Sequence, residues 1–414
     1  MSSSSLLQSF DYHINPIFNV SAVPVFTDAD NDHIESLVAD IDRLVERFVH
    51  EPGLLSRTAI QRQIRATIAD LRGFIHGRTS PGSLLQRALD ACLEFATSFI
   101  VEMLRKQAHT SWNAKTKRDS SCSSAEYKHL IDNGFCEYSI PMTNAFVSYR
   151  DAQLEEARAM YAGQDDWRGI RFEGYRRTDG CKHILRFIRA SGIPELVSEY
   201  KCADMELRSI GWGYHHHRQT WFKNINGVSH RSATNYYHLD GEPDMVKMIV
   251  YLTDVEEGDG PFRYVRSSHR LPRSFFRFAL HLGAETRVNS MIEGPSGNYC
   301  RNLFSHGRSL LMQFPSCFIG STHFGDDLVE GSSLSRYLLD NTVVFTRPAG
   351  SCILFDGFLG VHAGGNPLSG ERLAVQIGFV RRRTLREKTQ TFARRNVSRV
   401  VNSVRSFPRF KGKL

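Results

Sequence analysis

NYYHLDGEP, residues 235–243, places a histidine and an aspartate two positions apart in an aromatic, strand-like segment. Alternate side chains of a strand point to the same face, so His238 and Asp240 are expected to project together. Gly241 then allows the chain to turn away. The pair is either the polar end of an edge strand or two ligands of a metal ion, and by itself it does not distinguish these alternatives.

A second segment supplies candidate partners for this pair. In SCILFDGFLGVHAGGNPLSGERLAVQIGFV, residues 351–380, the run CILF is typical of a buried strand, and His362 ends a second apolar stretch. The turn-forming AGGNPLSGE then leads into the strand-like RLAVQIGF. If these two strands pair as neighbours, Arg372 returns beside His362. A guanidinium in an otherwise apolar strand is costly unless an anion meets it, and its fork fits a carboxylate.

Two histidines and one carboxylate form the set that binds one face of Fe(II) and leaves three positions open. A 2-oxo acid such as 2-oxoglutarate can fill two of them, with its far carboxylate on Arg372, and O2 can take the third. Zinc needs only the three ligands and a water, and gives no reason for the arginine. The sequence therefore predicts His238, Asp240 and His362 as metal ligands and catalytic residues, and Arg372 as the cosubstrate-binding residue.

Three segments resemble the phytanoyl-CoA dioxygenase family: residues 127–140, 236–270 and 347–380. The resemblance covers about residues 125–382. It implies a double-stranded β-helix (jelly-roll, cupin-like) core, non-haem Fe(II), and 2-oxoglutarate and O2 as cosubstrates. By position, it assigns iron binding to His238, Asp240 and His362, and cosubstrate binding to Arg372. The implied reaction is hydroxylation, or a related oxidation, of a C–H bond in a small organic substrate, with decarboxylation of 2-oxoglutarate to succinate.

The chain departs from this family in two places. RSSH, residues 266–269, stands where the family often has Pro-Gly-Ser-His, and His269 is assigned no role. The long separation of His238 from His362 predicts an insertion near 271–341, which we expect to cover the mouth of the site as a substrate lid. Related halogenases lack the aspartate, so the presence of Asp240 favours hydroxylation. A run of three histidines, 215–217, is expected to be a solvated strand end.

The remaining patterns predict an α+β protein with flanking helices and an N-terminal helical region. Apolar residues from Ile34 to Val49 repeat at helical spacing, and similar patterns continue to about residue 107. The predicted order is a tail at 1–30, a helical accessory region at 31–107, a linker at 108–124, the oxygenase domain at 125–382, and a basic tail at 383–414.

Composition limits the classes of protein to consider. With 41% hydrophobic and 23% charged residues, the 414-residue chain is typical of soluble globular proteins. The eight cysteines form no Cys-x-x-Cys pair, and neither a signal peptide nor an uncharged span of about 20 residues is evident, so a cytoplasmic location is predicted. The net charge of +8 comes from the last segment, where residues 381–414 hold twelve Lys/Arg and one acidic residue. This tail could contact phosphates or acidic surfaces, but no motif predicts specific nucleic-acid binding.

Two alternatives to an active oxygenase stay open at this stage. One is a jelly-roll binding or scaffold protein that retains the fold without turnover. The other is a zinc hydrolase that uses the same His238, Asp240 and His362 set.

Overall fold

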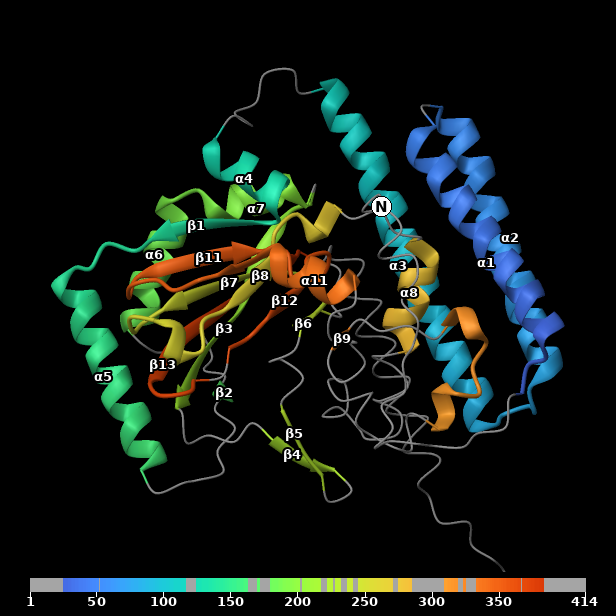
Figure 1. The fold of residues 1–414 in the computed structure, drawn as a ribbon. Helices are drawn as coiled ribbons and strands as arrows, with labels where there is room; N and C mark the ends of the chain where they lie inside the picture. Colours follow the sequence, from blue (N-terminus) through green and yellow to red (C-terminus); the bar gives the residue numbers. More distant parts are fainter. Residues whose placement is uncertain are drawn as a thin grey trace, which may run out of the picture.

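The computed structural model describes residues 25–51, 53–116, 124–162, 170–171, 179–201, 203–216, 222–225, 228–231, 237–240, 245–270, 275–284, 309–318, 323–324, 333–365 and 367–382. In these residues, a body of long helices lies beside two antiparallel sheets, and further helices cover the larger sheet (Figure 1). This mixture confirms the predicted α+β class. The basic tail, 383–414, lies outside the described residues.

Three helices form the N-terminal body: α1 (Asp28–His50), α2 (Leu54–Arg78) and α3 (Leu84–Thr116). Their apolar stripes meet in one core that includes Ile34, Leu71 and Leu89. The linker predicted at 108–124 is wrong in its first part, because α3 continues to Thr116. Residues 108–116 contain neither Gly nor Pro, so nothing in the local sequence stops the helix.

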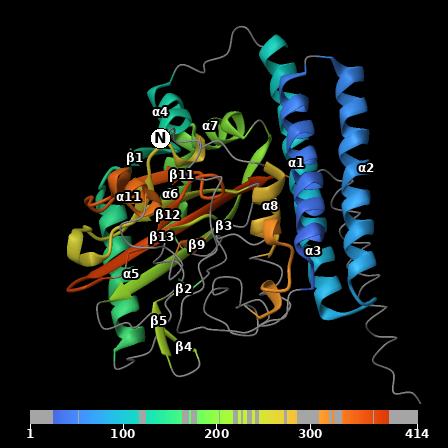
Figure 2. The ribbon, with the colours of Figure 1, turned by 45° about the vertical axis from the view of Figure 1, so that its right-hand side comes forward.

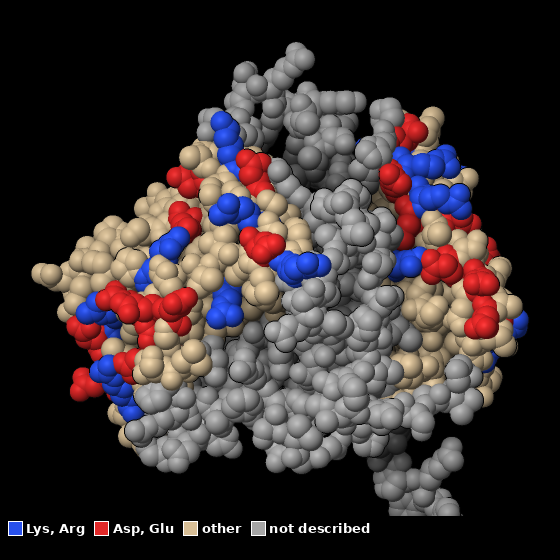
Figure 3. Space-filling model, viewed as in Figure 1, with Lys and Arg blue, Asp and Glu red and all other residues tan. Residues whose placement is uncertain are grey.

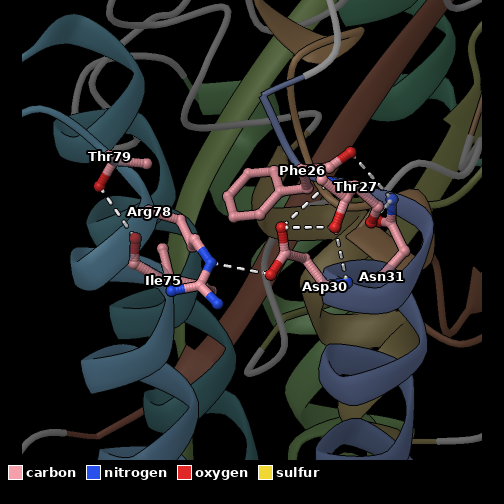
Figure 4. A network of polar contacts seen from close by, with 7 residues as sticks. All are labelled: Phe26, Thr27, Asp30, Asn31, Ile75, Arg78 and Thr79. Atoms are coloured by element: carbon pink, nitrogen blue, oxygen red, sulfur yellow. Dashed lines mark hydrogen bonds and ion pairs between the residues drawn. The ribbon is translucent and has the colours of Figure 1, made fainter.

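The start of α1 is fixed by a capping box. The Thr27 hydroxyl accepts from the Asp30 N–H at 3.2 Å, and the Asp30 carboxylate accepts from the Thr27 N–H at 3.0 Å (Figure 4). The same carboxylate accepts from Arg78 Nε at 2.8 Å, at the end of α2. One acidic side chain thus caps one helix and joins it to the next.

Part of the predicted insertion belongs to this helical body. Helix α8 (Phe275–Gly283) lies along α1 and α3, as Figure 2 shows from a second direction. Phe276 and Leu280 are fully buried in the core of the N-terminal helices, together with Leu311 from a later stretch of the insertion. The lid predicted over the site mouth falls largely on residues outside those described, including 285–308 and 325–332.

The described strands form a larger and a smaller sheet, and every pairing is antiparallel. The larger sheet has the order β1 (Phe135–Ser139), β11 (Ser351–Phe355), β7 (Met245–Tyr251), β13 (Glu371–Arg381), β3 (Met205–His216) and β2 (Ile170–Arg171). The smaller has the order β10 (Thr342–Val344), β8 (Arg263–Val265), β12 (His362–Ala363), β6 (Tyr237–His238) and β9 (His323–Phe324). A separate hairpin joins β4 (Phe222–Ile225) to β5 (Val228–Arg231).

The two faces of the larger sheet contact different partners. Alternate residues such as Val250, Leu354 and Val375 pack against four helices: α4 (Ala125–Asn133), α5 (Asn144–Tyr161), α6 (Asp179–Ala190) and α7 (Ile193–Tyr200). The residues between them, such as Tyr251 and Ile353, pack against the smaller sheet in a second core. The period of two in the strands therefore separates a helix-facing surface from a sheet-facing surface. Shorter elements are α11 (Ser333–Asp340) and the 3-10 turns η3 (Glu257–Asp259), η4 (Ser268–Arg270) and η8 (Ser316–Phe318).

An aromatic contact joins the helical body to the sheets. Phe358, in the loop between β11 and β12, is buried in the core of the N-terminal helices. Its ring centroid lies 5.1 Å from that of Phe99 in α3 and 6.2 Å from that of Phe278 in α8. The helices thus pack directly on the loop that leads to His362.

The described surface carries mixed charge. On the face shown in Figure 3, basic and acidic side chains are interspersed over the described residues of both the helices and the sheet region. Two ion pairs among the described, partly exposed side chains are Arg347 with Glu137 and Arg382 with Glu206. No helix within the described stretches is both long and apolar enough to cross a membrane.

A carboxylate of α1 caps the first turn of α8. Asp42 Oδ1 accepts from the Phe276 N–H at 2.7 Å, and burial raises the pKa of Asp42 to about 6, although the N–H groups of Phe276 and Arg277 act against the rise. The folded carboxyl therefore binds its proton more tightly than the unfolded one. Its contribution to the free energy of unfolding is complete at low pH and is lost as the pH rises through about 6.

We expect Asp42→Asn to remove this pH dependence, because the amide oxygen still caps α8 but carries no charge. Relative to the wild type, the variant should gain about 1–3 kcal/mol in free energy of unfolding between pH 4 and pH 7.5. Urea denaturation at the two pH values measures the difference. Asp40→Asn, at an exposed position of the same helix, is the matched control and should show no such gain. Equal pH profiles for the wild type and Asp42→Asn would contradict the expectation.

Candidate metal site

Three buried side chains from two distant parts of the chain converge at β6 and β12. His238 on β6 lies opposite His362 on β12 in the strand register, and their ring centroids are 4.3 Å apart. Asp240 follows directly after β6. The donor atoms of the three residues all lie within 4.8 Å of one another, and each residue is at most 6% exposed. The side chains predicted as metal ligands are therefore close enough to share one ion.

The strands around the triad differ from the prediction in two ways. Strand β6 ends at His238, so Asp240 is held not by strand pairing but by its N–H, which donates to the Gly357 carbonyl at 2.7 Å. The strands that flank His362 are also not neighbours, because β7 lies between β11 and β13. His362 itself belongs to the smaller sheet, whereas Arg372 lies on the larger one.

The loop between β11 and β12 is anchored by a fully buried carboxylate. Asp356 accepts from Lys201 Nζ at 2.6 Å and from the Tyr200 hydroxyl at 3.0 Å, both at the end of α7. It also accepts from the backbone N–H groups of Phe358 and Leu359. Burial would raise the pKa of Asp356, but Lys201 and these hydrogen bonds outweigh it, so the pKa is lowered and the group is ionised. Gly357 and His362 are thus held by a charged anchor.

Hydrogen bonding fixes the tautomer of His362. Its Nδ1 lies 3.0 Å from the Gly360 carbonyl, and since a carbonyl only accepts, Nδ1 carries the proton. The lone pair is then on Nε2, which lies 3.5 Å from Asp240 Oδ2. A ligand histidine in proteins is commonly oriented in this way by a carbonyl on its other nitrogen.

The Asp240 carboxylate is satisfied on one side only. Oδ1 accepts from Lys247 Nζ at 2.8 Å, whereas Oδ2 is buried with no hydrogen-bond donor in the described part of the chain. Burial raises the pKa of Asp240, but the charge of Lys247 holds the pKa below its usual range. A buried anionic oxygen without a donor, beside two imidazoles, fits a cation ligand. The donor set accordingly fits Fe(II) together with a 2-oxo acid.

Gly357 leaves room for this arrangement. A Cβ built on Gly357 would lie 2.0 Å from Asp240 Oδ2 and 3.1 Å from His362 Cε1. Any side chain at this position would therefore displace the carboxylate that faces the proposed ion.

Arg372 is a buried cation with few partners. It lies at the start of β13 and is 7% exposed, and its Nη2 donates to the Gly365 carbonyl at 3.2 Å. Within the described residues, no carboxylate lies within ion-pair distance of it. Burial lowers the pKa of Arg372, and the nearby Tyr251 and Asp259 only partly oppose this effect. A guanidinium in such a position is favoured only when an anion binds it.

Aromatic residues connect Arg372 to the triad. The ring centroids of Phe262 and His362 lie 5.9 Å apart. The backbone N–H of Phe262 donates to the Tyr251 hydroxyl at 2.9 Å. Tyr251 in turn is near enough to act on the pKa of Arg372. The arginine and the triad are therefore parts of one region between the two sheets.

Sequence reasoning missed Lys247, Gly357 and Asp356. Lys247 had a detectable signal, since it is the one charged residue in the strand MVKMIVY and lies on its sheet-facing side. Asp356 and Gly357 look like ordinary turn residues.

Two other histidines lie in described strands or turns. The Nε2 atom of His269, which was assigned no role, lies within hydrogen-bond distance of the Ile131 carbonyl, at 2.8 Å. His323 pairs with His238 in the register of β9 and β6, but its side chain lies outside the described residues.

Comparison with known proteins gives structural similarity without a family. No protein-family model matches the chain, and no curated protein matches it. The chain is similar to the non-haem α-ketoglutarate-dependent carbocyclase SnoK from nogalamycin biosynthesis, at 14% identity and a TM-score of 0.36, over 63% of this chain and 84% of that chain. It is similar to HygX from Streptomyces hygroscopicus with nickel and 2-oxoglutarate bound, at 14% identity and a TM-score of 0.34, over 63% and 88% of the two chains.

A further similar structure is the epimerase SnoN in complex with Fe3+, α-ketoglutarate and nogalamycin RO, at 14% identity and a TM-score of 0.34, over 62% of this chain and 82% of that chain. At these identities and TM-scores the similarities establish neither family nor function. Membership of the phytanoyl-CoA dioxygenase family stays a prediction.

We expect Gly357→Ala to weaken metal binding without unfolding the protein, because the new methyl group forces Asp240 Oδ2 away from the two imidazoles. The affinity for Co(II), measured by anaerobic titration of its visible absorption, should fall by about 10–100-fold. Gly73→Ala in α2, where an added Cβ has open space, is the matched control and should bind Co(II) as the wild type does. Unchanged affinity in Gly357→Ala would show that Oδ2 is not a ligand.

Proposed function

We propose that the protein is an Fe(II)/2-oxoglutarate-dependent dioxygenase that oxidises a C–H bond of a small organic substrate. The observation that carries the proposal is the combination of the His238, Asp240 and His362 cluster with the buried guanidinium of Arg372, which meets no carboxylate among the described residues. A metal triad alone is equally compatible with zinc. A buried cation in the same region additionally requires a carboxylate ligand, which a 2-oxo diacid supplies at its far end.

The three protein ligands would occupy one face of the ion and leave the opposite face for the cosubstrate and O2. When bound, iron would allow O2 to oxidise both 2-oxoglutarate and the substrate: one oxygen atom would enter succinate, with loss of CO2, and the other would enter the substrate. The residues of the chain position these groups. Lys247 holds Asp240 Oδ1 so that Oδ2 faces the ion, and Gly360 holds His362 in the tautomer that presents Nε2.

We also infer that the two sheets form a double-stranded β-helix. Eight strands support this, because successive strands alternate between the sheets except at one step: β3, β7, β11 and β13 lie in the larger sheet, and β6, β8, β10 and β12 in the smaller. The larger sheet has the internal order β11-β7-β13-β3 and the smaller the order β10-β8-β12-β6. Strand β9 adds to the edge of the smaller sheet from within the predicted insertion. This arrangement supports an oxygenase domain at about 125–382.

The surroundings of the triad would keep bulk water from the ion. The ring centroid of Phe355 lies 5.2 Å from that of His362, and the ring centroid of Phe262 lies 5.9 Å from the same imidazole. Both phenylalanines belong to the core between the sheets. A dry, aromatic wall of this kind protects a reactive centre and orients the ligand imidazole.

We expect His238→Ala and Asp240→Ala to abolish succinate formation from 2-oxoglutarate, because each removes one of three metal ligands. Succinate is measured by mass spectrometry with Fe(II), O2 and a metabolite extract as the source of substrate. His76→Ala, at an exposed position of α2, is the control and should retain wild-type turnover. Wild-type turnover in either triad variant would contradict the assignment. A wild-type protein that retains zinc and does not bind or consume 2-oxoglutarate would support the hydrolase alternative instead.

We expect Arg372→Met to weaken 2-oxoglutarate binding while Fe(II) binding is retained, because the variant removes the partner of the far carboxylate. The loss should be about 10–100-fold, as for a lost hydrogen bond to a charged group. Anaerobic titration of the Fe(II)-loaded protein, followed by the charge-transfer absorption of the chelate, gives the affinity. Arg208→Met, at an exposed position of β3, is the matched control. Equal 2-oxoglutarate affinity in Arg372→Met and the wild type would remove the anchoring role.

A further inference from the structure

His215 is the residue that lies directly opposite Arg372. In the antiparallel ladder of β3 and β13, the Cα partner of Arg372 is His215, and the next pair is Leu373 with Tyr214. Directly opposite residues in such a ladder have Cβ atoms about 4.5–5.5 Å apart, on the same face of the sheet. The expected solvated strand end is therefore wrong for His215, which is part-buried and paired with a cation.

The alternation of both strands shows which face this is. Tyr214 and Leu373 are buried in the core that packs against the helices. His215 and Arg372 therefore point to the other side, toward the smaller sheet and the triad. Ala374, two residues after Arg372, contacts the core between the sheets, which confirms the direction.

Glycines of β3 continue this face beside the pair, whereas β7 contributes Tyr251 opposite Ala374 on the other side of β13. Along the same face, the next opposite pair is Ala374 with Gly213, followed by Gln376 with Gly211. Gln376 is exposed although it lies on a central strand, so solvent reaches this face of the sheet.

The charge of Arg372 affects the state of His215. Burial first, and then the guanidinium charge, hold the pKa of His215 well below its usual range. The imidazole is accordingly neutral near pH 7, with one N–H to donate. A neutral donor next to a guanidinium adds a hydrogen bond to an anion without adding a second buried charge.

We propose that His215 is a second cosubstrate-binding residue, whose imidazole N–H donates to the same far carboxylate that Arg372 binds. This inference rests on the proposed function, because 2-oxoglutarate is the anion in question. It goes beyond that function by making the site selective for a 2-oxo diacid over a 2-oxo monoacid through two groups on neighbouring strands. Arg372 supplies the charge and fork, and His215 supplies a directed neutral hydrogen bond.

The test compares two ligands that differ only at the far end. The Fe(II)-loaded protein is titrated anaerobically with 2-oxoglutarate and with 2-oxopentanoate, which has the same carbon chain without the far carboxylate. His215→Phe should weaken 2-oxoglutarate binding about tenfold, the loss expected for one hydrogen bond to a charged acceptor. The affinity for 2-oxopentanoate should stay at the wild-type value, because that ligand offers no acceptor to His215.

Three further variants complete the experiment. His215→Ala should show the same selective loss, so the result does not depend on accommodating a phenyl ring. His215→Gln, which retains an N–H donor, should recover part of the 2-oxoglutarate affinity. His216→Phe changes the adjacent residue on the opposite face of β3 and should leave both affinities unchanged.

Equal 2-oxoglutarate affinity in the wild type and both His215 variants would overturn the proposal. Equal weakening of the two ligands would also overturn it, because it would indicate a structural effect on the sheet. A wild-type protein that binds Fe(II) but gives no chelate absorption with either ligand would instead refute the proposed function, and the role of His215 with it.

Discussion

The antiparallel pairing of β6 with β12 is the interaction on which the site depends. Each strand is two residues long, and the pairing sets His238 directly opposite His362 across the smaller sheet. Strands this short have little stability of their own, so their neighbours must hold them in place. Strand β8 on one side and β9 on the other provide this support in the described residues. The convergence of the triad is thus a property of the assembled sheet and not of any local segment.

Buried charge is the second constraint. Lys201 with Asp356, Lys247 with Asp240, and Arg372 all lie in or beside the region between the sheets. Removing one partner of such a buried pair typically destabilises a protein by about 3–5 kcal/mol, because the other charge is left without compensation. The first pair is complete within the protein. Among the described residues, the second pair leaves one Asp240 oxygen without a donor, and Arg372 donates only to a carbonyl. These unsatisfied groups lie where a cation and an anion would bind.

Much of the site could be predicted from sequence because its chemistry requires particular residue types. Four polar residues stand out within apolar, strand-like runs: His238, Asp240, His362 and Arg372. A single site that would use all four side chains is an iron ion with a bound 2-oxo acid. The pairing of strands could not be predicted in the same way. The assumption that β11 and β13 are neighbours failed because β7, far earlier in the chain, lies between them. Long-range strand order depends on the whole sheet, and local patterns do not contain it. Gly357 was missed for a related reason, since its small size matters only after Asp240 has been placed beside it.

The packing of Phe358 on Phe99 changes how the N-terminal helices should be regarded. A chain shortened to begin near residue 125 would leave α8 and Phe358 with their apolar sides in water. Phe358 follows Gly357 directly, in the loop that delivers His362. The helices therefore hold that loop in place. Removing them to obtain a shorter chain would expose apolar surface that promotes aggregation and would loosen the His238, Asp240 and His362 cluster.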